Sequence, residues 1–278
     1  MRSFVALVRK QVLESRWTLL ISFAALFGLG WLYVFVTSLN EAEIFKALSS
    51  EEGDRRFRWM QSMGVMERPS TASIIAAFWN SPLIEVMVII WAIGRGSGAV
   101  GAEVERGTLD LILSRPVSRS TYLASQVLVA VVGLAVLAVG LPLGAIIGSQ
   151  YNFLREPPTF LTLLRPAVNL AALGLPIFGY TLLVSALDHV RWRATTIGSV
   201  VTLAMFIARV VSVIPVLQKY RWRDWLDRIT IFKLYNPVDA VGAGAELGYN
   251  LAVLSGTAAV FIALAFVGFA RRDLPASG

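Results

Sequence analysis

The run "YLASQVLVAVVGLAVLAVGLPLGAIIG", residues 122–148, contains no charged side chain. A helix needs about 20 consecutive apolar residues to cross the hydrocarbon core of a bilayer. This run is longer than that limit, so it predicts a membrane-spanning helix. Its repeated glycines are of the kind that lets neighbouring membrane helices approach closely.

The same length and polarity criteria predict five more spans. They cover residues 17–39, 73–94, 166–187, 194–217 and 247–270. The first is too long for the core of a signal peptide, and no small-residue cleavage pattern follows it, so we predict an uncleaved helix. The sequence therefore predicts an all-α, polytopic membrane protein with six transmembrane helices.

Composition supports a membrane protein and excludes several other classes. The chain has 278 residues, of which 56% are hydrophobic and only 15% charged, and its mean hydropathy is +0.67. Its formal net charge is +7, but no zinc-finger or RNA-binding signature accompanies that charge, so anionic lipid headgroups are expected partners and nucleic acid is not. With no cysteine and one histidine, we expect no metal site and no catalytic residue in this chain.

Lysine and arginine indicate the orientation of the spans. They are denser in residues 1–16, 101–119, 188–194 and 271–278 than in the segments on the opposite side of the membrane. Because loops rich in these residues stay in the cytoplasm, both termini are expected there. The segment between the second and third spans is then cytoplasmic.

That segment contains "EVERGTLDLILSRPVSR", residues 103–119. Its charged and apolar residues alternate with helical spacing, which predicts a short amphipathic helix over residues 103–114. Pro116 disfavours helix at the residue before it, and Ser118 or Ser120 can cap the next span. The residues alone leave two interpretations open: a solvated helix anchored by its leucines, or an element that docks onto another protein.

The same segment resembles a signature of the type-2 exporter permeases of ABC transporters, in which an acidic pair, "GTL" and "PVSR" recur. The basic amphipathic helix predicted over residues 1–16 and "LYNPVDAV", residues 234–241, are also similar to single six-span permease subunits of that family. In the family this segment is the coupling helix, which sits in a groove of a separate cytosolic ATPase. The resemblance implies ATPase-coupling roles for Glu103, Glu105, Gly107, Thr108, Leu109, Leu113, Pro116 and Arg119.

The resemblance also implies the partners and the location. Two cytosolic ABC ATPase subunits would bind ATP and Mg²⁺, since this chain has no Walker A sequence and no cofactor of its own. The glycine-rich "GRGSGAVG", residues 94–101, lacks the required lysine and instead predicts close helix packing. A second permease chain, identical or homologous, would complete an export pathway in the plasma (inner) membrane of a prokaryotic cell.

We expect one permease domain over residues 1–278, with an interfacial helix at 1–16, the coupling helix at 103–114 and an outer interfacial segment at 218–246. The last mixes aromatic and basic residues, as is typical of headgroup interfaces. Within the spans, Glu85 and Arg209 are the intramembrane polar candidates. They could pair or share a polar cavity, or each could be accommodated separately by protonation, local hydrogen bonding or snorkelling.

Two other functions remain open at this point. A permease-like subunit could drive signalling or envelope remodelling with no cargo, although the predicted outer segments are short for a partner-binding domain. An intramembrane protease is the remote alternative, because "EEGDRR", residues 51–56, fits the first motif of CAAX-type metalloproteases. That motif lies in a predicted outer loop, and His189, the only histidine, is expected on the other side of the membrane.

Overall fold

The computed structural model describes residues 2–48, 70–108, 117–188, 190–214, 220, 222–242, 244 and 246–271. Within these residues the chain is helical and has no strand, which confirms the predicted all-α fold. The elements are α1 (Arg2–Leu48), α3 (Thr71–Phe78), α4 (Pro82–Gly98), α5 (Gly101–Glu105), α7 (Arg119–Tyr151), α8 (Phe160–Leu187), α9 (Arg191–Val213), α10 (Trp222–Ile229), the 3₁₀ helix η2 (Ile231–Leu234), α11 (Pro237–Val241) and α12 (Leu247–Arg271).

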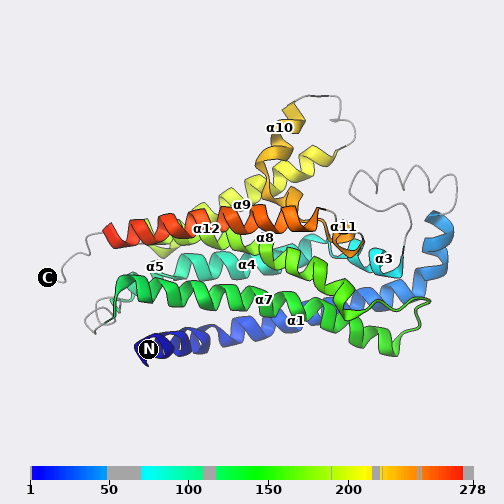
Figure 1. The fold of residues 1–278 in the computed structure, drawn as a ribbon, viewed down its shortest axis with the longest axis horizontal. Coiled ribbons are helices and arrows are strands. Elements are labelled where there is room, and N and C mark those ends of the chain that lie inside the picture. Colours follow the sequence, from blue (N-terminus) through cyan, green and yellow to red (C-terminus); the bar gives the residue numbers. More distant parts are fainter. Residues whose placement is uncertain are drawn as a thin grey trace.

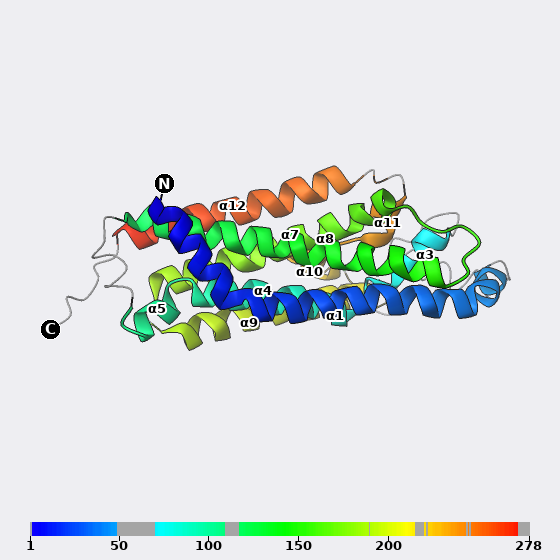
Figure 2. The same ribbon diagram turned by 90° about the horizontal axis from the view of Figure 1, so that it is seen from below.

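The long helices lie side by side in a bundle. Helix α8 packs against α4, α7 and α12, and α1 packs along α7. In Figures 1 and 2 the beginning of α1 and the end of α12 lie at the same end of the bundle as α5. We call this the α5 end. Helices α3 and α11 lie at the opposite end (Figure 1).

Within the described residues five helices are long and apolar enough to cross a membrane, and the count is six if α3 and α4 together make one broken span. These two helices are bent by 56° at their junction. The predicted span over residues 73–94 is therefore broken. The reason is Pro82 at the first position of α4, which has no backbone N–H and forces Ser81 into an extended conformation (φ −69°, ψ 131°).

The predicted interfacial helix over residues 1–16 is not a separate element. Helix α1 continues without interruption from Arg2 to Leu48, although its first turns run at an angle to the rest (Figure 2). No glycine or proline lies between residues 1 and 27, so nothing in the sequence ends the helix where it meets the first span.

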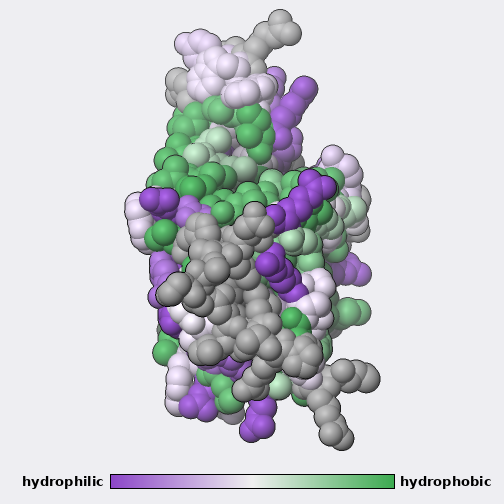
Figure 3. Space-filling view, turned by 90° about the vertical axis from the view of Figure 1, so that its left-hand side faces the viewer, coloured by the Kyte–Doolittle hydropathy of each residue, from purple (hydrophilic) through white to green (hydrophobic). Residues whose placement is uncertain are grey.

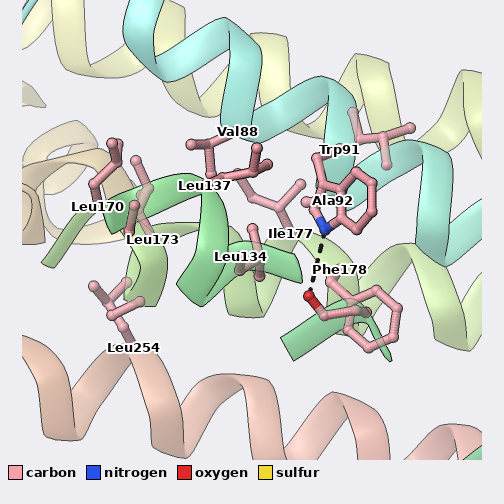
Figure 4. Close-up of a cluster of buried hydrophobic side chains, with 14 of the residues drawn as sticks. Val88, Trp91, Ala92, Leu134, Leu137, Leu170, Leu173, Ile177, Phe178 and Leu254 are labelled. Atoms are coloured by element: carbon pink, nitrogen blue, oxygen red, sulfur yellow. Dashed lines mark hydrogen bonds between the residues drawn. The ribbon is translucent and has the colours of Figure 1, made fainter. Parts of the chain in front are cut away.

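The apolar core lies where α4, α7, α8 and α12 meet (Figure 4). Trp91 is 2% exposed, and its Nε1 donates a hydrogen bond to the carbonyl of Ala130 over 3.3 Å. A Cβ at Gly133 would lie 2.1 Å from the Trp91 ring. The indole therefore occupies the space above a glycine of α7, which fixes how closely α4 and α7 approach.

Candidate functional site

The break between α4 and α5 is held by a serine of α8. The backbone N–H groups of Val100 and Gly101 donate to Ser185 Oγ over 3.2 and 3.0 Å, and Ser185 donates to the Ser97 carbonyl over 2.9 Å. A hydroxyl has one donor and two acceptor positions, so Ser185 uses all of them here. These bonds satisfy backbone groups that the helix break would otherwise leave unpaired.

Helix α7 holds the same break from another side. The Ala99 carbonyl accepts hydrogen bonds from Tyr122 Oη over 2.5 Å and from Gln126 Nε2 over 3.2 Å. Gln126 Oε1 also accepts from the guanidinium of Arg95 over 2.8 Å. The polar residues in the first turns of α7 thus bind the loop between α4 and α5.

Glu103, on α5, joins this segment to α1. It is 4% exposed, and its Oε1 accepts from Lys10 Nζ over 2.8 Å. Its Oε2 accepts from the Thr108 hydroxyl. Burial alone would raise the pKa of Glu103. The hydrogen bonds from Lys10 and Thr108 and the charges of Lys10 and Arg106 together have a larger, opposite effect, so the pKa is below its ordinary value. The carboxylate is therefore ionised at neutral pH.

The predicted continuous helix over residues 103–114 is wrong in its boundaries. Helix α5 begins at Gly101 and ends at Glu105. Gly107 follows with φ +64°, a conformation that side chains with a Cβ rarely adopt and that ends helices. Gly107 is thus required for its backbone conformation. The predicted coupling residues Leu109, Leu113 and Pro116 lie outside the described residues.

Glu105 joins α5 to α9. Its Oε1 accepts from the backbone N–H of Arg191, the first residue of α9, over 2.7 Å. The backbones are also close, because a Cβ on Gly101 would lie 3.0 Å from the Arg191 Cα. A carboxylate at a helix N-terminus is favourable, since the first N–H groups of a helix have no partner within it.

Arg119 joins α7 to α12. It is the first residue of α7, and its guanidinium donates to the carbonyls of Phe269 and Ala270 over 3.3 and 3.4 Å. A cation at the last turn of α12 is stabilised by the unpaired carbonyls there. Ser118 caps α7 by accepting from the N–H of Thr121, as one of the two predicted caps.

Residues 99–108, which we call the α5 segment, therefore form a junction with polar contacts to α1, α7, α8 and α9. Glu103, Glu105, Thr108 and Arg119, all singled out from the sequence, lie at this one end of the bundle. The contacts themselves were not predicted. Lys10 binds Glu103 and the backbone N–H of Arg191 binds Glu105. Tyr122, Gln126 and Ser185 bind the backbone of residues 99–101. The sequence does indicate the polar contacts of α7, because Tyr122 and Gln126 are polar residues one helical turn apart in a largely apolar span.

Glu85 and Arg209 do not form an ion pair. Arg209 Nη1 lies 3.2 Å from Asp227 Oδ1, and the other Asp227 oxygen lies 2.7 Å from Lys233 Nζ. Burial raises the pKa of Asp227, but Lys233 and Arg209 lower it to below its ordinary value. Glu85 is 7% exposed, and one of its oxygens has no hydrogen-bond partner within the described part of the chain.

Ser185→Ala is expected to destabilise the protein by about 2–6 kcal/mol, because two buried N–H groups would each lose their acceptor at roughly 1–3 kcal/mol. Thermal unfolding of the detergent-solubilised protein measures the change. Ser149→Ala is the matched control, since its hydroxyl donates only to the Ile146 carbonyl of its own helix. Equal stability of the two variants would contradict the role given to Ser185.

Comparison with known proteins agrees with this architecture. No curated protein matches the chain. The family model described as "ABC-2 family transporter protein" matches residues 9–274, which is nearly the whole chain and includes every membrane-crossing helix. A multi-pass membrane protein with this match belongs to the ABC-2 family of transporter proteins, and the chain is a permease subunit of an ABC transporter.

Proposed function

We propose that this permease forms, as a dimer with a second permease chain, the membrane pathway of an ATP-driven exporter. Two separate cytosolic ABC ATPase subunits bind ATP and Mg²⁺ and drive it. The observation that carries the proposal is the junction at the α5 end. One short segment there has polar contacts to four helices that belong to different parts of the bundle.

Such a junction is suited to transmitting a mechanical displacement. Glu103 binds α1 and Glu105 binds α9, on opposite sides of a helix only five residues long. A displacement of α5 by a docked ATPase therefore acts on both helices, and through Ser185 on α8. Packed helices change position as rigid bodies between discrete arrangements, so a push at one end alters the outer end as well.

The proposed orientation places the α5 end and both termini in the cytoplasm of a prokaryotic cell, with the permease in its plasma (inner) membrane. Arginines at this end support it: Arg95, Arg106, Arg119, Arg191, Arg193 and Arg271. Cytoplasmic flanks of membrane spans are enriched in such residues. Figure 3, which looks onto this end, shows hydrophilic side chains along its rim beside a strongly apolar flank.

The apolar outer surface of α9 supports the dimer. Only four of its residues are buried in the single chain. Large apolar side chains are exposed along its length: Ile197, Val200, Leu203, Ile207 and Val210. A second permease packed against this helix would enclose a pathway between the two chains.

Photo-crosslinking from Arg106 tests the proposed docking. This side chain is exposed at the α5 end, so a photoreactive amino acid there should capture a cytosolic P-loop ATPase in native membranes, identified by mass spectrometry. The same probe at Tyr249, exposed at the start of α12, should not capture it. Capture of lipid alone from position 106 would contradict ATPase docking at this segment.

Gly107→Lys is expected to uncouple ATP hydrolysis from movement of the permease. The new side chain costs roughly 1–2 kcal/mol at φ +64° and protrudes toward the proposed ATPase. The chain has no cysteine, so a single Val86→Cys, in α4, reports movement through its maleimide-labelling rate with and without ATP. The ATP-dependent change in that rate should fall at least fivefold.

Two control variants separate the effects of backbone conformation and of added charge in Gly107→Lys. Gly107→Asn should retain most of the coupling, because asparagine tolerates positive φ better than other residues. Gly248→Lys adds the same charge in open space on α12 and should leave coupling unchanged. An ATP-dependent change of normal size in Gly107→Lys would argue against coupling through this segment.

A further inference from the structure

Two cavities of the permease are neighbours and share part of their lining. The first, about 240 Å³, lies at the α5 end among α1, α4, α5, α7 and α9. The second, about 470 Å³, is a groove between α4 and α9. They share Ile90, Gly94 and Arg191 as lining residues. The first cavity, lined by charged side chains, is the polar end of the site, and the groove is its apolar part.

Arginine side chains outnumber acidic side chains in the lining of the polar end. Arg95, Arg106 and Arg191 line it, and none of them forms an ion pair within the described residues. Its two carboxylates, Glu14 and Glu103, both bind Lys10, at 3.6 and 2.8 Å. With Lys10 there are four cations for these two carboxylates, and the excess of positive charge favours binding of an anion.

Arg95 gives the most specific indication that an anion binds in this cavity. Its guanidinium donates to the neutral side chain of Gln126, and its Nε is buried without a hydrogen-bond acceptor among the described residues. A buried donor left unpaired is unfavourable, and more so when it carries charge. An anion in this cavity would supply the missing acceptor.

The groove is suited to a hydrocarbon chain. It is lined mainly by apolar side chains of α4 and α9, among them Val86, Ile89, Ile93, Leu203 and Phe206. From Gly94 to Pro82 it follows α4 over about 18 Å, at 1.5 Å per helical residue. Arg95 lies one turn from the end of α4, which is the depth of lipid headgroups. Polar end and groove together match the shape of one amphiphile.

We propose that the two cavities together bind one anionic phospholipid of the surrounding bilayer. Its phosphate lies between Arg95, Arg106 and Arg191, and one acyl chain runs along the groove toward Glu85. Because Arg106 follows α5 directly, the lipid contacts the junction that transmits movement. The site does not depend on the ATPase, so it can be tested on the permease alone.

The binding experiment uses the purified permease in an uncharged detergent and native mass spectrometry to measure retained lipid. The probes are dioleoylphosphatidylglycerol, dioleoylphosphatidylcholine and inorganic phosphate. We expect phosphatidylglycerol to bind at least tenfold more tightly than phosphatidylcholine, whose choline would meet the arginines. Arg106→Gln combined with Arg191→Gln should lower phosphatidylglycerol affinity at least tenfold, because two charged hydrogen-bond donors to the phosphate are lost.

A matched control separates the site from net charge. Arg193 lies one helical half-turn from Arg191 and is bound to Asp188 over 3.8 Å outside the cavity. Arg193→Gln should leave phosphatidylglycerol affinity unchanged. Arg106 and Arg191 are exposed, so their replacement does not threaten folding. A loss of affinity in Arg193→Gln as large as that in Arg191→Gln alone would overturn the proposed site, as would equal affinity for the two lipids.

Gly94→Leu tests the groove separately. An added Cβ at Gly94 meets no atom within 4 Å, so leucine would block the junction of the cavities without displacing the backbone. Phosphatidylglycerol affinity should fall at least tenfold, while Gly28→Leu, in similarly open space on α1, should have no effect. Normal affinity in Gly94→Leu, or phosphate binding as tight as lipid binding, would assign the arginines to a free anion and overturn the lipid.

Glu85 offers the competing ligand class, an amphiphilic cation held by the buried carboxylate at the far end of the groove. Glu85→Gln should not weaken phosphatidylglycerol binding, because the phosphate lies at the other end. Dodecyltrimethylammonium is the cationic probe. Tighter binding of this cation than of phosphatidylglycerol, lost in Glu85→Gln, would overturn the anionic lipid in favour of a cationic ligand.

Discussion

Gly144→Ala is expected to lower the free energy of unfolding by about 3 kcal/mol or more. Helices α1 and α7 are in backbone contact at this point, since a Cβ on Gly144 would lie 2.0 Å from the Phe27 carbonyl oxygen and 2.9 Å from its carbon. Gly30 makes the reciprocal contact, because a Cβ there would lie 2.3 Å from the Leu141 carbonyl oxygen. These neighbours are backbone atoms of a helix, so they cannot move aside as a side chain does.

The whole of α1 would therefore have to shift away from α7. Overpacking of a dense interior costs typically about 1–3 kcal/mol, and loss of close contact along the helix pair adds to that cost, because membrane helices associate largely through van der Waals packing. Unfolding in mixed micelles of increasing SDS content measures the change. The wild type should withstand a higher SDS content than Gly144→Ala.

Gly28→Ala is the matched control for this substitution. It lies on the same helix pair, and nothing lies within 4 Å of its added Cβ. Its stability should be unchanged or raised by a few tenths of a kcal/mol, since alanine is a better helix former than glycine. If both variants were equally stable, the packing of α1 on α7 at Gly144 would be disproved.

Glu103→Lys is expected to abolish coupling between ATP hydrolysis and movement of the permease, with at least a tenfold reduction. The substitution removes the carboxylate that accepts from Lys10 and from the Thr108 hydroxyl and places a like charge beside Lys10. An ion buried without a partner is strongly unfavourable. Helix α5 should then lose its connection to α1 while its contacts with α8 and α9 remain.

The labelling rate of the single Val86→Cys with and without ATP is again the measurement. Glu156→Lys, in an exposed position of the loop between α7 and α8, makes the same change in net charge and should behave as wild type. Lys10→Glu together with Glu103→Lys should recover part of the coupling by restoring an opposite-charge pair. A normal ATP response in Glu103→Lys would show that the contact with α1 transmits nothing.

Local patterns identified the spans and several helix ends. An uncharged run such as residues 122–148 predicts a helix because the bilayer leaves no other way to pair its backbone groups. Pro82 at the first position of α4 likewise acts locally, where the second span bends. Ser118 caps α7 because its side chain bonds a neighbouring N–H three residues away, a contact that sequence proximity already specifies.

The boundaries of the predicted coupling helix could not be predicted from the sequence pattern. Charged and apolar residues recur with helical spacing across Gly107, and that spacing predicted a helix over residues 103–114. The structure instead ends α5 at Glu105, because the chain turns at a glycine with positive φ. A periodic pattern does not distinguish a continuous helix from two short segments joined by such a turn.

The sequence by itself determined the membrane class, the apolar helices and the segment that forms the junction, because length, polarity and local capping are properties of neighbouring residues. Only the tertiary structure decided which polar groups meet. Lys10 and Glu103 are 93 residues apart, and Arg209 binds Asp227 rather than Glu85. Such contacts depend on how helices pack against one another, and the close approach of their backbones at glycines sets that packing.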